Sequence, residues 1–264
     1  MVEELAKLAV TALAVLALSV VAERVSPRAS GLLAGYPLGG AIALFFIGWE
    51  NGAAFAASSA IHTLGGLTAS LVFVYVYYRL SASDSWLGMT AASVGAIGAF
   101  LLSAFLLSML SLGWAAGAAL TAAAAACGSR LFRGIENALI GRRMRLSLRL
   151  LLLRSLVAGS IVLAVTGAAK VSGPVLAGFL AAFPITLFPL LLVVHGSHGR
   201  KPAHTIIKNF PLGLGSLLVY ALTVVLSYER WGLVRGTAAS FAVATLYLAA
   251  ASWLGRAGGP GRER

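Results

Sequence analysis

Charged residues are scarce in this sequence. They make up 11% of the 264 residues, and only 8 residues are Asp or Glu. Soluble domains are about one quarter charged, so a water-soluble fold of this length is excluded. Apolar residues make up 59% and fall into stretches of roughly 20 residues, the length with which a helix crosses a ~30 Å hydrocarbon core. The sequence therefore predicts an all-α, polytopic bundle of transmembrane helices.

Cysteine and recognisable catalytic groups are equally sparse. Cys127 is the only cysteine, so no internal disulfide can form. No constellation of acid, base and nucleophile recurs within the apolar stretches, so we expect neither an enzyme nor a cofactor. The net charge of +12 comes mainly from arginine beside apolar stretches, where it orients helices and meets anionic lipid headgroups. We therefore expect a multi-pass protein of the cell (inner or plasma) membrane and no nucleic-acid partner.

An internal duplication organises the chain. Residues 147 positions apart match over two long segments, and the matches include prolines and glycines that chance rarely aligns. Lys7 is matched in the same register by Arg154. The principal pairs are Pro27 with Pro174, Pro37 with Pro184, Gly31 with Gly178, Gly52 with Gly199, and Gly66 with Gly213. Self-similarity at a fixed offset indicates a repeated structural unit.

Each copy predicts four apolar spans. In the first copy they cover about 4–22, 30–49, 54–79 and 86–109, and in the second about 151–169, 175–195, 203–227 and 233–254. The chain is thus expected to comprise a first four-helix repeat (1–110), a linker (111–149) and a second four-helix repeat (150–264). The linker holds an alanine-rich segment, Gly113–Gly128, followed by a basic segment.

The distribution of arginine decides between two topologies. The segment 130–149 carries six arginines against Glu136 alone, so it is expected on the cytoplasmic side together with the C-terminus. If Gly113–Gly128 also crosses, the chain has nine spans, and the remaining basic connections are also cytoplasmic. If it does not cross, there are eight spans. We favour nine, because eight would move Arg24 and Arg28 outside and bring the acidic N-terminal segment inside. An odd number of crossings between the starts of the two copies then makes them an inverted repeat, as in many secondary transporters.

A short motif in the second copy carries a family resemblance. The run Val175-Leu-Ala-Gly-Phe-Leu-Ala-Ala-Phe-Pro-Ile-Thr186, with His195 and the following helix, resembles the GlpM family of small bacterial inner-membrane proteins. The family's members look like single four-helix units, so this chain resembles a fused tandem duplication, over about 151–254 and more weakly over 4–109. The first copy departs from the motif, with Gly48 in the place of His195. The resemblance implies a shared fold and supplies no catalytic or binding residues.

Pro37 and Pro184 lie near the middle of their spans and are the leading candidates for a substrate site. A proline within a helix removes a backbone hydrogen bond and frees carbonyl groups. Paired interruptions at equivalent places in two repeats are typical of a central transport site, and Thr186 is a candidate polar contact there. The alternative is a plain kink that serves helix packing.

Three polar residues at membrane depth are further candidates for substrate binding. His62 and Asn209 occupy equivalent positions in the third spans, and Lys208 precedes Asn209. Polar groups at such depth often line substrate paths or proton relays. Histidine ordinarily changes charge near neutral pH, so His62 is also a candidate for proton coupling. Lys208 would attract an anionic group. The alternatives are interhelical hydrogen bonds for His62 and Asn209, and a lysine that extends to the membrane interface.

Glu50 and three histidines lie at the expected ends of spans. Glu50 is a candidate for proton or ion coupling, although a solvated helix cap is the simpler interpretation. His195, His198 and His204 are loosely spaced as metal ligands, but Arg200 and Lys201 would repel a cation, so we expect no metal site. The pattern of apolar residues and arginines in 130–149 indicates a helix on the membrane surface that meets anionic headgroups.

These features favour a transporter or permease with an inverted-repeat core. It would move a small or amphipathic solute, with an anion among the candidates, by alternating access. A channel is a variant of this hypothesis. The alternatives are a protein that moves a phosphate-bearing lipid, and a non-transporting component that assembles or regulates a partner. A homo-oligomer is compatible with the sequence, which does not name the solute or the coupling ion.

Overall fold

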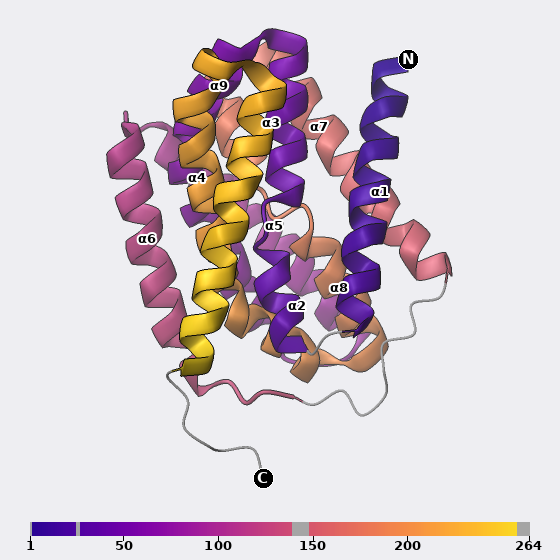
Figure 1. The fold of residues 1–264 in the computed structure, drawn as a ribbon. Helices are drawn as coiled ribbons and strands as arrows, with labels where there is room; N and C mark the ends of the chain where they lie inside the picture. The colour runs from indigo at the N-terminus through magenta and orange to yellow at the C-terminus, as the bar shows by residue number, and fades with distance from the viewer. Residues whose placement is uncertain (1, 25–26, 139–147, 258–264) are drawn as a thin grey trace.

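The described residues of the computed structural model, 2–24, 27–138 and 148–257, form helices and connections with no strand among them (Figure 1). Together the helices make an all-helical bundle. Their bounds are α1 Val2–Arg24, α2 Pro27–Ala34, α3 Leu38–Asn51, α4 Ala53–Leu80, α5 Trp86–Ser108, α6 Trp114–Leu131, the 3-10 turn η1 Phe132–Gly134, α7 Leu148–Ala181, α8 Leu187–His198 and α9 Arg200–Ala257.

Within these ranges, six helical segments are long and apolar enough to cross a membrane. Two of them are long enough to turn back on themselves. Arg200–Trp253 has 54 residues, more than twice the ~20 that one crossing needs, and it bends at Gly232. Leu151–Ala181 bends in the same way at Gly173. Both glycines have a φ of about +73°, which only glycine adopts without strain. The bundle is that of a membrane protein, as the apolar composition predicts.

The two central prolines interrupt their spans completely. Pro37 separates α2 from α3, and Pro184 lies in the gap between α7 and α8. The segment of α7 beyond its bend, Pro174–Ala181, lies 147 positions after α2, so the helix bounds repeat with the sequence. The mid-span breaks expected from the prolines are therefore present, because a proline ring cannot be accommodated within a continuous helical ladder.

The linker follows the expectation in its first part only. The alanine-rich segment forms α6, a single apolar helix that packs on α4 and α9. The basic segment does not continue as a helix after η1: residues 135–138 are irregular, and Phe132 is buried against Tyr78 rather than facing lipid. The prediction of a surface helix across 135–138 is therefore wrong. Residues 139–147, with Arg142, Arg143 and Arg145, and the basic end of the chain, 258–264, lie outside the described residues.

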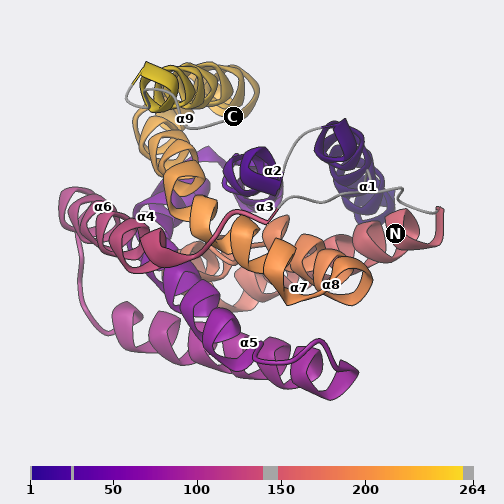
Figure 2. The same ribbon diagram turned by 90° about the horizontal axis from the view of Figure 1, so that it is seen from below.

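Helix α4 and the part of α9 before Gly232 occupy the centre of the bundle, while α1 and α6 lie at opposite edges and the end of α9 lies on the outside (Figures 1 and 2). The short helix α2 packs on α9, and α7 packs on α4. Glycine makes these contacts close: a Cβ added to Gly31 would lie 2.8 Å from the Cβ of Asn209, and one added to Gly178 would lie 2.8 Å from the Cβ of His62. Small residues at helix contacts are the usual means of close packing in membranes, where dispersion contacts replace the hydrophobic effect.

Gly178→Ala should therefore destabilise the protein. The new methyl group would overlap the backbone oxygen of Ser59, and overpacking of this kind costs about 1–3 kcal/mol. Gly167→Ala, in the same helix but with nothing within 4 Å of the added Cβ, is the matched control and should stabilise by up to about 1 kcal/mol. Thermal unfolding of the detergent-solubilised protein measures both. Equal melting temperatures for the two variants would contradict the close contact.

Candidate functional site

The two interrupted spans meet at the middle of the bundle. A Cβ added to Gly39, in the first turn of α3, would lie 2.8 Å from the Cβ of Ile185 and 3.3 Å from the Cγ2 of Thr186, at the start of α8. Both breaks line one small cavity of about 10 Å³, which has room for about one water molecule. The cavity residues include Tyr36, Gly39, Gly40, Ser70, Pro184, Ile185 and Thr186.

Side-chain hydroxyls satisfy the carbonyl groups that the breaks release. A carbonyl left unpaired in hydrocarbon costs several kcal/mol. Three of the four donors come from α4 and α9, and Thr186 comes from the other break. The Ser216 hydroxyl donates to Gly35 O at 3.0 Å, and the Thr186 hydroxyl donates to Ala34 O at 3.2 Å. On the other break, the Ser70 hydroxyl donates to Ala182 O, and the Thr63 hydroxyl donates to Gly178 O, which also accepts the Ala182 amide at 3.2 Å.

The amide ends of the helices remain at the cavity. The first N–H groups of a helix have no partner within it, and these ends carry the positive part of the helix dipole. Gly39 and Gly40 of α3 line the cavity together with Thr186, which precedes α8. At the start of α8 the Phe188 amide already donates to Pro184 O at 2.9 Å, and Pro189 has no amide hydrogen, so the first turn of α3 supplies the helix amides that face the cavity.

Of the predicted substrate residues, Pro184 and Thr186 line the central cavity, and Pro37 borders it at the N-terminus of α3. His62 and Asn209 do not line it. Each instead packs beside an interrupted span of the other copy: His62 lies against Gly178 and Phe179, and Asn209 lies against Gly31. The Asn209 amide donates to its own helix, to Thr205 O at 2.8 Å.

Lys208 lies apart from the central cavity. Its ammonium group donates to the backbone oxygen of Ile135, just after η1. One turn earlier on α9, the hydroxyl of Thr205 accepts the Ala138 amide at 2.9 Å. The two side chains fasten the irregular start of the linker to α9. A direct role for Lys208 in binding a solute at the centre is therefore not compatible with its position.

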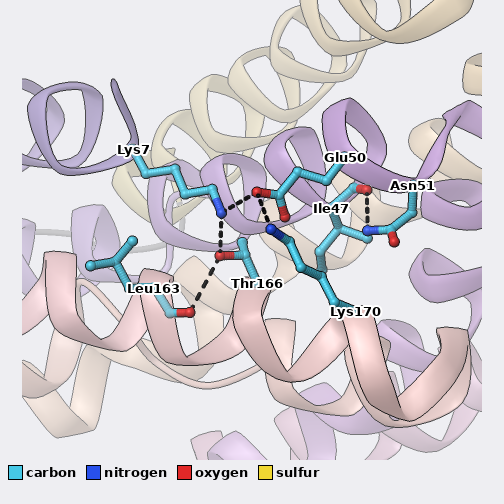
Figure 3. Close-up of polar contacts among 7 residues, drawn as sticks. All are labelled: Lys7, Ile47, Glu50, Asn51, Leu163, Thr166 and Lys170. Atoms are coloured by element: carbon cyan, nitrogen blue, oxygen red, sulfur yellow. Dashed lines mark hydrogen bonds and ion pairs between the residues drawn. The ribbon is translucent and has the colours of Figure 1, made fainter. Parts of the chain in front are cut away.

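Glu50 is the acid of a buried cluster rather than a solvated cap (Figure 3). Its side chain is 4% exposed and pairs with Lys7, which is 3% exposed, and with Lys170 at 3.4 Å. Lys7 also donates to the hydroxyl of Thr166 at 2.9 Å. The four residues come from α1, α3 and α7, so the cluster joins the two copies. The interpretation of Glu50 as a solvated cap is wrong, because α1 covers this end of α3.

At the other end of the bundle, α8 and α9 hold the connection between α4 and α5. His195 is buried, accepts from the hydroxyl of Tyr77 at 3.1 Å, and donates through Nε2 to Ser83 O at 3.2 Å. Arg200 donates its guanidinium to Ala82 O and its amide to Asp84 Oδ1 at 2.6 Å. His204 Nε2 lies 2.8 Å from the Ser81 hydroxyl. His195 and His204 thus serve as structural contacts between the two copies.

Sequence reasoning missed the hydroxyls of Ser70 and Ser216 and the partners of Glu50. Serine within an apolar span is common and carries no signal by itself, because the carbonyl it reaches is distant in sequence. Lys7 gave a usable signal: it is a lysine inside a predicted span, and such a charge requires a partner. The sequence did not indicate which acid would provide it.

Comparisons of this chain with protein-family models, with curated proteins and with solved structures gave no match. The function is therefore inferred from the arrangement of the residues themselves.

Glu50→Gln should destabilise the bundle by about 3–5 kcal/mol, because it leaves the buried Lys7 ammonium without a counter-charge. Lys7→Met combined with Glu50→Gln should recover most of that loss, since both charges of the buried pair are then removed. SDS-induced unfolding in mixed micelles, followed by tryptophan fluorescence, measures these differences.

Glu229→Gln is the control for the loss of an acid, because Glu229 is exposed on α9. It should unfold at the same SDS fraction as the unaltered protein. If the single Glu50 variant is as stable as this control, or if the double variant is no better than the single one, the buried pair does not stabilise the fold.

Proposed function

We propose that this protein is a secondary transporter that moves a small anionic solute across the cell membrane by alternating access. The observation that carries the proposal is the meeting of two interrupted spans, at positions 147 residues apart, around one central cavity. Interrupted helices near the midplane are tolerated where they are packed in protein or line a cavity. They form the substrate sites of many transporters with inverted repeats.

The proposal includes an inverted arrangement of the two copies, which two sets of contacts support. Lys7, near the start of α1, contacts Thr166, near the end of the first part of α7, so the two equivalent helices run in opposite directions (Figure 1). The contacts across the copies are reciprocal. Gly31 packs on Asn209, and Gly178 packs on His62, with each pair 147 positions from the other, as a two-fold relation requires. With bends at Gly173 and Gly232 and with α6 crossing, the chain spans the membrane nine times.

The anionic class of solute follows from the donors at the centre. The N-terminus of α3, with Gly39 and Gly40, begins at the cavity, and helix N-termini favour negative charge. The serine and threonine hydroxyls already occupy the carbonyls that would coordinate a cation. A solute such as a carboxylate or phosphate ester would bind between Gly39, Gly40 and Thr186 once the breaks separate.

Alternating access requires each end of the bundle to open in turn. In the closed arrangement the Glu50 cluster joins α1, α3 and α7 at one end. The contacts of His195 and Arg200 join α8 and α9 to the α4–α5 connection at the other. Glu50 is the coupling group of this mechanism, because a proton on its carboxylate would weaken its pairing with both lysines. His62, beside the break after Gly178, is the second candidate for proton coupling.

The resemblance to the GlpM family remains part of this proposal as a shared four-helix unit. The resemblance does not indicate which solute is transported.

Removal of both central prolines should impair transport. In proteoliposomes, we expect Pro37→Ala with Pro184→Ala to lower the uptake of a transported anion at least tenfold, because continuous helices would close the central site. The probes are radiolabelled glycerol 3-phosphate, inorganic phosphate, acetate and lactate, each with and without an imposed pH gradient. Pro211→Ala, at a proline inside the unbroken part of α9, is the matched control and should transport normally.

Two results would contradict the proposal. One is that none of the four anions enters faster than into protein-free liposomes. The other is that the triple variant, with both proline substitutions and His62→Ala, takes up the anion as fast as the unaltered protein does.

The topology can be tested separately. On a Cys127→Ser background, single cysteines at residues 5 and 256 should react with a membrane-impermeant maleimide from opposite sides of the membrane, residue 5 from outside. A cysteine at residue 133 should behave as the one at 256. Labelling of residues 5 and 256 from the same side would exclude the nine-span inverted arrangement.

A further inference from the structure

A basic cleft lies at the turn between α8 and α9, away from the central cavity. It measures about 330 Å³ and is lined by Asp84, Ala138, His198, Gly199, Arg200, Lys201 and Pro202. This volume is far larger than that of the central cavity and falls in the range of small-molecule sites. Three basic side chains from one short turn face it, against one carboxylate from the α4–α5 connection.

The conformation of this turn does not require basic side chains, although Arg200 also contacts the α4–α5 connection. The turn 147 positions earlier, Asn51-Gly52-Ala53-Ala54-Phe55, is built in the same way, with Gly52 at φ +95° where Gly199 has φ +80°. That turn joins α3 to α4 without a single charge. His198, Arg200 and Lys201 are therefore additions to a turn that forms without them, and they give one end of the bundle a property that the other end lacks.

The cleft retains unused donors. Asp84 accepts the Arg200 amide at 2.6 Å, so the first amide of α9 is already occupied and the helix end is not the binding group. Arg200 gives part of its guanidinium to Ala82 O and keeps further N–H donors. Lys201 is exposed, and His198 Nδ1 is shielded from solvent and has no hydrogen-bond partner among the described residues.

We propose that this cleft binds a phosphate group. Arginine and lysine beside each other provide a bidentate donor and a point charge, the combination that phosphate oxygens favour. The cleft lies at the end of the membrane-spanning helices, where basic pockets meet the headgroups of anionic lipids. The phosphate belongs either to such a headgroup or to a free phosphate ester, and the ligand occupies the cleft whether or not the central site transports.

The alternative role for these residues is to fix the orientation of the chain during insertion. An orienting charge acts while the chain enters the membrane and needs no bound ligand afterwards. Purified protein therefore separates the two roles.

The test measures binding to the full-length protein in neutral detergent. Dioctanoyl phosphatidylglycerol is the lipid probe, dioctanoyl phosphatidylcholine its zwitterionic control, and glycerol 3-phosphate the free ester. His198→Asn with Lys201→Gln should weaken phosphatidylglycerol binding at least tenfold. Lys201→Gln alone, at an exposed side chain that folding does not need, should weaken it about threefold, and it carries the test if the double variant is unstable. Arg230→Gln, which removes an exposed charge elsewhere on α9, should bind as the unaltered protein does.

The two probes identify the source of the phosphate. If glycerol 3-phosphate binds and displaces phosphatidylglycerol, the site takes a free ester; if only the lipid binds, it is a headgroup site. The proposal is overturned if neither probe binds, if phosphatidylcholine binds as well as phosphatidylglycerol, or if Arg230→Gln weakens binding as much as Lys201→Gln does.

Discussion

Every backbone carbonyl and amide inside an apolar bundle needs a partner, and this requirement governs the centre of the protein. The breaks at Pro37 and Pro184 release carbonyls where no water can solvate them. The structure supplies hydroxyls from the neighbouring helices, Ser216 and Thr186 on one break and Thr63 and Ser70 on the other. These hydroxyls reach the carbonyls only because glycine brings the helices close together, as at Gly31 and Gly178. The breaks, the hydroxyls and the glycines thus depend on one another.

The ends of the bundle are held together by other kinds of contact than its centre. At one end, Glu50 and Lys7 are buried as a pair, and Lys170 remains half exposed beside them. At the other end, most contacts run from side chains to backbone oxygens, as with His195 and Arg200. A buried ion pair is sensitive to the loss of one charge, whereas a contact to a backbone oxygen survives many substitutions of the residue that accepts it. The two ends of the bundle are therefore closed by interactions of different chemistry.

The two copies have also diverged in charge. The turn at Gly52 is neutral, and the equivalent turn at Gly199 carries three basic side chains. The backbone conformation is kept at both positions because each needs a positive φ. Side chains that the turn does not use for folding are free to change. Comparison of the two turns therefore separates residues that the turn conformation needs from residues that it does not need.

The sequence alone determined the class of the protein and the position of its helices. Runs of roughly 20 apolar residues specify spans, and Pro37 and Pro184 specify where two of them break, because these are properties of local chemistry. The offset of 147 relates Gly52 to Gly199, and both glycines have a positive φ. The expected surface helix across 135–138 failed because tertiary contacts to Thr205 and Lys208 override a local pattern.

Only the tertiary structure decided which polar groups meet. In the structure Glu50 is buried between two lysines, and Lys208 donates to a linker carbonyl. His62 and Asn209 lie against helices of the opposite copy. A partner several helical turns away or on another helix leaves no mark on local periodicity, so neither composition nor spacing could identify it. The physical reason is that burial sets the requirement for a partner, and burial is known only once the helices are packed.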